Sequence, residues 1–116
     1  MQHINPGPRL SGAVVHGGMV YVSGQVPLTP NADVPTQTRE ILGKIDQILA
    51  QAGSDKRLIV SASIWLADII TFDQMNGAWD AWIAPGPAPA RATVEARIAN
   101  AQWRVEIACI AAVKET

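Results

Sequence analysis

One arginine of this chain stands where its side chain could hold a small carboxylate. Arg91 follows the segment 85–90, Pro-Gly-Pro-Ala-Pro-Ala, and precedes the apolar residues 92–94. Alternating prolines favour an extended, semi-rigid backbone, which keeps the next side chain in place. The planar guanidinium matches a carboxylate through two parallel hydrogen bonds. Taken alone, however, an arginine after a turn is more often a plain surface residue. The role of Arg91 therefore has to be inferred from the rest of the chain.

A glutamate in the last apolar segment offers a partner for this arginine. Glu106 shares one side of the predicted strand with Ala108, Ile110 and Ala112. A carboxylate in such a setting costs free energy unless it is paired or hydrogen-bonded. Two interpretations remain open. Arg91 and Glu106 form a buried ion pair, or both line a small polar pocket at a subunit interface, in which Arg91 binds a substrate carboxylate and Glu106 orients a water molecule.

Other kinds of chemistry find little support in the residue spacing. His3 and His16 are far apart and have no carboxylate or cysteine at metal-ligand spacing, so no metal site and no cofactor are expected. No glycine-rich phosphate loop and no nucleophile elbow occur. The single cysteine, Cys109, lies in an apolar strand pattern and is expected to be a core thiol in a reducing compartment.

Composition narrows the class of protein further. The 116 residues predict one domain, 1–116, that is 48% hydrophobic and only 16% charged, with a formal net charge of −1. That charge argues against nucleic acid and against a membrane surface as partners. The first residues resemble no signal peptide and no apolar run approaches a membrane span, so a cytoplasmic location is expected.

The apolar periodicity predicts strands and two helices. Strands are expected over 12–16 and 19–24, joined by Gly17-Gly18 as a hairpin turn. From about residue 36 an apolar stripe at helical spacing predicts a helix that ends at Gly53. The remaining expected elements are a strand over 58–66, a helix over 72–83, and strands over 91–96 and 103–113.

The order of these elements, β-β-α-β-α-β-β, predicts a two-layer α+β sandwich with one sheet of four or five strands. Two helices cover only one face of such a sheet. The other face of the last strand is small and apolar in its middle, whereas a face open to water carries polar residues. We therefore expect a second copy of the chain to cover it.

Several motifs together resemble the RidA/YjgF/UK114 family of reactive-intermediate deaminases over nearly the whole chain. The motifs are Val22-Ser23-Gly24-Gln25-Val26-Pro27, Gln37-Thr38-Arg39, Phe72 with Met75-Asn76, Pro89-Ala90-Arg91-Ala92-Thr93-Val94, and Val105 to Ala111. The resemblance implies a chorismate-mutase-like fold, a homotrimer with a barrel-like core of sheets, and active clefts between subunits. It also implies hydrolysis of enamine or imine intermediates, which carry a carboxylate, to 2-keto acids and ammonia.

The resemblance also assigns residues. It implies that Arg91 binds the substrate carboxylate, that Glu106 lies near the attacking water, and that Ser23 and Asn76 belong to the pocket. The chain departs from the family pattern at three places. Arg9 stands where archetypal members have a pocket tyrosine, Thr93 replaces a cysteine, and Ala108 replaces a second acidic residue. Thr93 and Arg9 are therefore expected to contact the substrate.

These departures leave the identity of the substrate open. A second cation at Arg9 would suit a larger, more acidic substrate. Besides the imine deaminase, two alternatives remain: a binding or regulatory trimer that has lost hydrolysis, and a pathway-specific deaminase of aminoacrylate-like or aminomuconate-like compounds.

Overall fold

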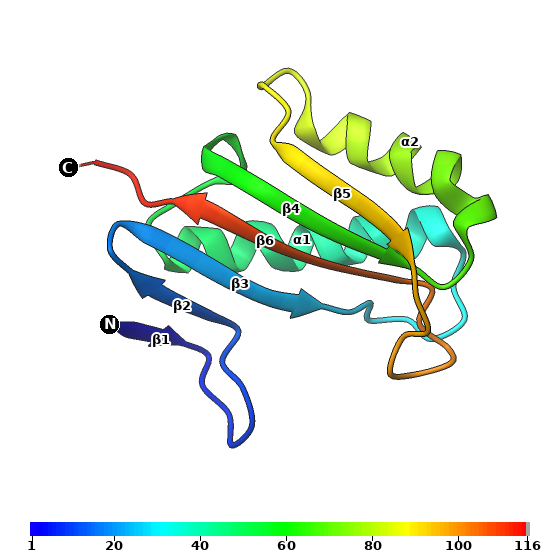
Figure 1. The fold of residues 1–116 in the computed structure, drawn as a ribbon, viewed down its shortest axis with the longest axis horizontal. Helices are drawn as coiled ribbons and strands as arrows, with labels where there is room; N and C mark the ends of the chain where they lie inside the picture. Colours follow the sequence, from blue (N-terminus) through cyan, green and yellow to red (C-terminus); the bar gives the residue numbers. More distant parts are fainter. Residues whose placement is uncertain (116) are drawn as a thin grey trace.

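The computed structural model describes residues 1–115 as a six-stranded sheet with two helices on one face (Figure 1). The strands are β1 (Gln2–Ile4), β2 (Ala13–His16), β3 (Met19–Gln25), β4 (Ile59–Leu66), β5 (Ala90–Glu95) and β6 (Val105–Ala112). The helices are α1 (Val34–Gln51) and α2 (Phe72–Ile83). This confirms the predicted two-layer α+β class.

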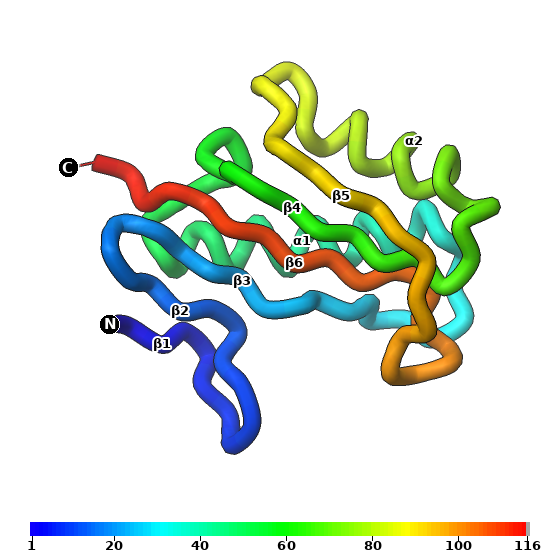
Figure 2. The backbone as a smooth tube through the Cα atoms, in the orientation of Figure 1, coloured from blue at the N-terminus to red at the C-terminus, as the bar shows by residue number. Residues whose placement is uncertain are grey.

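The sheet has the order β1-β2-β3-β6-β4-β5. Its neighbouring strands run antiparallel except β4 and β5, which are parallel because α2 carries the chain back between them. In Figure 2 the ends of β3, β4 and β5 and the start of β6 lie at the same end of the sheet. Segments far apart in sequence are thereby brought close together.

Two expectations about the strands and helix bounds were wrong. The sheet has six strands rather than four or five, because residues 2–4 pair with β2 as an extra edge strand. The first helix begins at Val34 rather than near residue 36. Asp33 caps it by accepting a hydrogen bond from Thr36 N at 2.8 Å, and Pro35 is tolerated in the first turn, where its missing N–H has no partner to lose.

Other bounds follow the sequence patterns. Gly17 and Gly18 both have positive φ, 62° and 77°, as a two-residue hairpin turn between β2 and β3 requires. Gly53 ends the first helix with φ 75°. The last strand spans 105–112, shorter than the expected 103–113, because the chain turns through residues 99–102 immediately before it.

The core lies between the helices and one face of the sheet. In β6 the residues Val105, Ile107, Cys109 and Ala111 are buried and alternate with half-buried neighbours. The buried face of α1 meets them with Ile41, Leu42, Ile45, Ile48 and Leu49, the stripe that the sequence predicted. Since this face alone is packed, the side chains of Glu106 and its alternating neighbours project to the other side.

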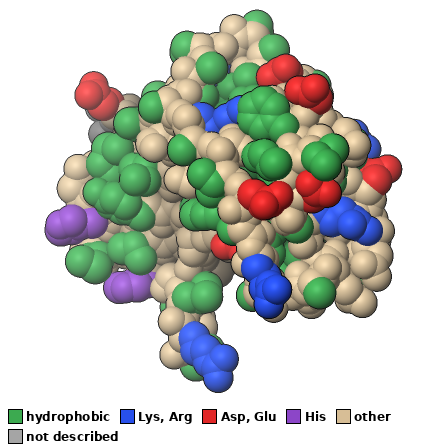
Figure 3. All heavy atoms as spheres, turned by 45° about the vertical axis from the view of Figure 1, so that its right-hand side comes forward, with side chains coloured by type: hydrophobic (Ala, Val, Ile, Leu, Met, Phe, Trp, Pro, Cys, Tyr) green, Lys and Arg blue, Asp and Glu red, His purple; other side chains and the backbone are tan. Residues whose placement is uncertain are grey.

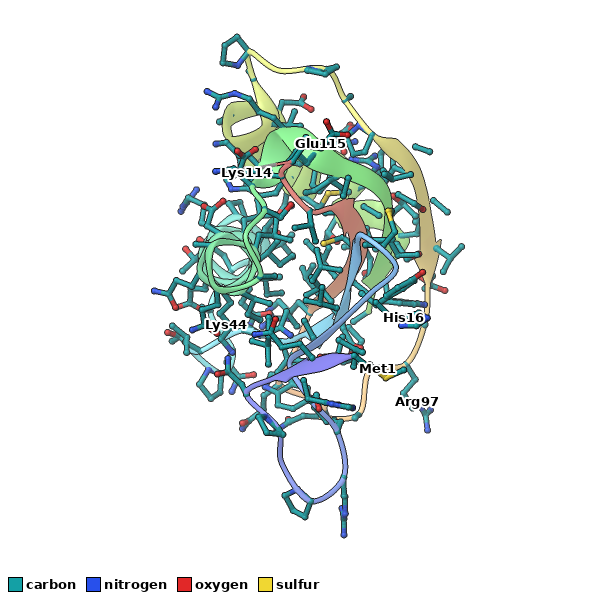
Figure 4. All side chains as sticks on the ribbon, turned by 90° about the vertical axis from the view of Figure 1, so that its left-hand side faces the viewer. Met1, His16, Lys44, Arg97, Lys114 and Glu115 are labelled. Atoms are coloured by element: carbon teal, nitrogen blue, oxygen red, sulfur yellow. The ribbon has the colours of Figure 1, made fainter. Side chains whose placement is uncertain are left out.

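The second face of the sheet carries no helix or strand of the described chain, as the edge-on view in Figure 4 shows. Its surface is largely apolar: Tyr21 is 46% and Val94 50% exposed, and Ile110 is half-buried. This face is called the open face below. No helix within residues 1–115 is long and apolar enough to cross a membrane.

Candidate functional site

Arg91 lies at the edge of the sheet and faces the helices. It pairs in register with Ala62 of β4, a core residue, and neighbours in register share a face. Its guanidinium carbon lies 5.3 Å from the ring centre of Trp79 and 5.8 Å from that of Phe72, both in α2. These cation–π contacts hold the arginine head in place without using its hydrogen-bond donors.

The donors of Arg91 are therefore available to a ligand. No ion pair or hydrogen bond joins its guanidinium to any acceptor within residues 1–115. Burial lowers the pKa of Arg91, and the negative charge of Asp80 opposes that effect. A partly desolvated guanidinium with unused donors is well suited to a carboxylate ligand.

Thr93 and Asn76 lie next to Arg91. Thr93 is two residues further along β5 and so on the same face, and its hydroxyl oxygen is buried with no hydrogen-bond partner in the described chain. Asn76 is four residues after Phe72 in α2 and three before Trp79, so it lies on the helix face that meets Arg91. The arginine, its two aromatic contacts and these two polar residues are called the arginine half-site.

Glu106 lies on the open face near the start of β6. It is paired in register with Trp65, and both are half-buried. Glu106 and Trp65 border a hollow of about 230 Å³ that is closed on its other side by residues 96–99. Burial raises the pKa of Glu106, and no hydrogen bond or ion pair within the described residues satisfies its carboxylate. A raised pKa makes such a carboxylate a better proton acceptor than an exposed glutamate.

Ser23 belongs to the same face as Glu106, at an irregularity of β3. The pairing of β3 with β6 shifts between Val22 and Gln25, so two residues, Ser23 and Gly24, oppose Ala108. The Ser23 hydroxyl donates to the carbonyl of Gly12 at 3.0 Å and accepts from Gln25 Nε2 at 3.3 Å. Its proton is thus already used within the chain, which leaves an acceptor lone pair rather than a donor for a ligand.

Arg91 and Glu106 do not meet within one chain, and the expectation of an ion pair between them is wrong. They lie on opposite faces of the sheet, two strands apart. The registers Ala62–Arg91 and Trp65–Glu106 also place them three residues apart along β4. Strand spacing and rise then put their Cα atoms about 14 Å apart. A pocket lined by both residues requires two copies of the chain.

Arg9 is not brought to either group. It is exposed in the loop between β1 and β2, which leaves the sheet at the edge opposite β5 (Figure 1). Within one chain Arg9 therefore contacts neither Arg91 nor Glu106. Its expected role as a substrate contact stays a prediction that depends on how copies assemble.

The sequence missed the aromatic contacts of Arg91. Phe72 and Trp79 are seven residues apart in α2, a spacing that places both on one helix face, but that spacing does not connect them with Arg91. Trp79 is indeed buried, at 4% exposure, whereas Phe72 is 37% exposed. Figure 3 brings the β5 and α2 side of the molecule forward and shows hydrophobic surface beside both acidic and basic side chains.

Another hollow lies between α1 and α2. It has a volume of about 500 Å³ and is lined by Leu42, Ala78 and Trp82 among others, and none of the predicted site residues borders it. If the site is shared between copies, one chain holds only part of its wall, and cavity size in a single chain does not locate it. We assign the site from Arg91 and Glu106 because their unsatisfied charged groups require partners.

The other candidate residues have structural surroundings. Cys109 is buried, and burial raises its pKa to about 12, which fits the expected inert core thiol. His3 and His16 are exposed. No group of three or more metal-ligating side chains occurs in residues 1–115.

The chain is a small two-layer α+β domain whose second sheet face is apolar and uncovered. Arg91 lies on one side of its sheet and Glu106 on the other. Comparison with known proteins identifies the family. The model of the endoribonuclease L-PSP family matches residues 1–113. The chain belongs to this family, which is the RidA/YjgF group that its motifs resemble.

Relatives and solved structures agree with this membership. A RutC family protein of Haemophilus influenzae is 46% identical over 112 residues, covering 96% of this chain and 97% of its own. The RutC family protein YoaB of Escherichia coli is 45% identical over 105 residues, which is 90% of this chain and 91% of YoaB. The crystal structure of a YjgF family member from Neisseria meningitidis has a TM-score of 0.95 at 43% identity, and the match covers 99% of this chain and 96% of that one.

Proposed function

We propose that the chain is a hydrolytic deaminase of small imines or enamines that carry a carboxylate, working at clefts between the subunits of a homotrimer. The observation that carries this proposal is that Arg91 presents a guanidinium held by aromatic contacts, with no acceptor among residues 1–115. Glu106, the only unsatisfied carboxylate singled out above, faces the other side of the sheet. A second copy that covers the open face would bring the two half-sites together.

The roles of the residues follow from their chemistry. Arg91 binds the substrate carboxylate, which places the neighbouring imine carbon at the Glu106 of another subunit. Glu106 accepts a proton from water as the water oxygen bonds to that carbon, and the imine nitrogen is protonated. The resulting carbinolamine loses ammonia and leaves a 2-keto acid. An imine plus one water thus gives one keto acid and one ammonia, with no change of oxidation state.

Thr93 and Asn76 supply polar contacts near Arg91. A buried hydroxyl without a partner costs about 1–3 kcal/mol, so a ligand that hydrogen-bonds to Thr93 recovers free energy that the empty protein lacks. Ser23 offers a hydrogen-bond acceptor near Glu106. We also propose a cytoplasmic location, in keeping with the free thiol of Cys109.

The test measures ammonia released from freshly generated 2-iminopropionate. The variant Arg91→Ala should lose at least about 100-fold in kcat/KM, since it removes a bidentate, partly desolvated contact. Arg57→Ala, at an exposed arginine, is the matched control and should retain wild-type turnover. Unchanged turnover in Arg91→Ala would refute the assignment.

The binding module and the pathway-specific deaminase predict different results in the same assay. If the wild type turns over no imine in a panel derived from different amino acids, yet binds 2-keto acids through Arg91, the chain is a binding module. If it turns over only aminoacrylate-like or aminomuconate-like compounds, it is a pathway-specific deaminase. Loss of activity in Arg9→Ala with the more acidic substrates alone would place Arg9 at the cleft.

A further inference from the structure

Gly24 is the residue of the β3 irregularity that lies closest to Glu106. A methyl group built on its Cα would overlap a carboxylate oxygen of Glu106 and lie 3.0 Å from the carboxylate carbon and 3.3 Å from Cγ. Real Cβ atoms essentially never approach other atoms so closely. The Glu106 side chain therefore lies directly across the backbone of Gly24, in space that any other residue type would fill.

Backbone conformation does not explain the glycine at this position. The glycines with positive φ in the described chain are Gly17, Gly18 and Gly53, and Gly24 is not among them. A residue with a side chain could adopt the Gly24 backbone, so the absence of a side chain there serves a neighbour. The three heavy atoms nearest to the added group all belong to Glu106.

The strand irregularity explains why position 24 faces Glu106. In a regular strand Ser23 would face the open side and residue 24 the core. The extra residue between Val22 and Gln25 turns this alternation by one position. Bulges of this kind redirect side chains and are frequent beside functional sites. Here the bulge turns position 24 toward the Glu106 carboxylate, and glycine has no side chain there that would collide with it.

We propose that Gly24 is a positioning residue, whose missing side chain lets the Glu106 carboxylate lie across the β3 bulge in the orientation that hydrolysis needs. This inference rests on the proposed function, because it assigns the carboxylate to water activation. The hydrogen bonds of Ser23 to Gly12 and Gln25 hold the bulge in shape from the other side. Nothing holds the Glu106 carboxylate itself in the described chain, so its place is set by the space left open.

The variant Gly24→Ala tests this directly. The displaced carboxylate should lower kcat by about 100-fold and change KM by less than about threefold, since Arg91 still grips the substrate. Gly43→Ala is the matched control, because no atom lies within 4 Å of a Cβ added there, and it should keep wild-type kinetics.

A second substitution separates positioning from damage to the strand. In the Glu106→Asp background the carboxylate is one carbon shorter, so Gly24→Ala should cost less than about threefold there. If Gly24→Ala costs the same factor in both backgrounds, the bulge itself is disturbed and the inference is wrong. Should Gly24→Ala fail to fold, Gly24→Ala/Glu106→Ala must fold; a double variant that also fails to fold would overturn the inference.

A readout independent of activity separates this inference from the proposed function. The carboxyl carbon signal of Glu106, assigned by its loss in Glu106→Gln, reports its titration by NMR. In wild type its midpoint should lie above that of an exposed glutamate, and Gly24→Ala should move it toward the exposed value as the carboxylate is pushed into water. The charged group that borders the same hollow is Arg97, whereas Glu95 pairs with the core residue Leu66 and accepts a hydrogen bond from Ile69 N at 3.0 Å on the helix side of the sheet.

The two failures are thus distinguishable. A moved midpoint with no imine turnover in any protein would support the role of Gly24 and reject the deaminase. An active wild type, with kinetics and midpoint both unchanged in Gly24→Ala, would reject the role of Gly24 and leave the deaminase standing.

Discussion

The placement of Arg91 and Glu106 on opposite faces makes a quantitative prediction about mixed oligomers. If each site takes its arginine from one copy and its glutamate from another, then Arg91→Ala and Glu106→Gln chains should complement each other. A site is complete where the arginine comes from a Glu106→Gln chain and the glutamate from an Arg91→Ala chain. With equal amounts mixed at random, each condition is met half the time, so about one quarter of all sites are intact.

The mixed species, once isolated, report the number of subunits. Two different affinity tags, one on each variant, select oligomers that contain both chains. In a cyclic trimer of either mixed composition one of the three sites is intact, so ammonia release should reach about one third of the wild-type rate per chain. In a two-fold dimer it would be about one half.

The assay needs co-expression, because chains must assemble together rather than exchange afterwards. Ammonia release from 2-iminopropionate is measured for the doubly tagged species, for each single variant and for wild type carrying both tags. Each single variant should show less than about 1% of wild-type activity. The reasoning is refuted if the doubly tagged species is as inactive as the single variants. Arg91 of one copy and Glu106 of another would then not form a common site.

Three further predictions concern single residues. Gln37 is fully buried and joins two loops, one through Thr29 and the other through Gln102 and Arg104. Gln37→Leu should therefore lower the free energy of unfolding by about 2–4 kcal/mol in urea, whereas exposed Gln47→Leu should change it little. Cys109, with a pKa of about 12, should resist iodoacetamide at pH 8 in the folded protein; mass spectrometry showing fast alkylation would contradict this. Burial raises the pKa of Glu106 above 4.5, so the folded state binds the carboxyl proton more tightly than the unfolded state does. The free energy of unfolding should therefore fall as the pH rises from 4.5 through the raised pKa. Glu106→Gln should abolish that fall while losing turnover, and a variant less stable than wild type at pH 7 would count against it.

Much of the fold could be predicted from local patterns. The stripe of α1 and the Gly17-Gly18 turn each depend on residues close in sequence, and the structure has both. The missed strand β1 has only three residues, and its pairing with β2 is set by the loop between them rather than by any apolar period. The early start of α1 was readable from Asp33, a strong N-cap, but the neighbouring Pro35 suggested a loop.

The candidate site was harder to predict because residue types do not reveal which face a strand presents. The sequence placed Glu106 on the open face correctly, since the residues directly before and after it, Val105 and Ile107, are buried on the other face. The face of Arg91 depends on its register with Ala62, a long-range pairing that no local pattern encodes. The apolar setting of Glu106 left an ion pair with Arg91 as one of two interpretations, and only the two registers together show that the charges lie on opposite faces of the sheet.

The placement of Arg91 and Glu106 on opposite faces also explains why each charge remains without a partner among the described residues. Arg91 and Glu106 are separated by the sheet itself, so neither can relieve the other's desolvation within one chain. A fold that only needed stability would have gained from replacing both by apolar residues of similar size. Instead, two aromatic side chains contact Arg91, and Gly24 leaves space for the Glu106 carboxylate. Both charged groups can therefore bind partners from outside the chain. In the proposed assembly, copies that pack over the open face would complete the site as well as cover the apolar surface.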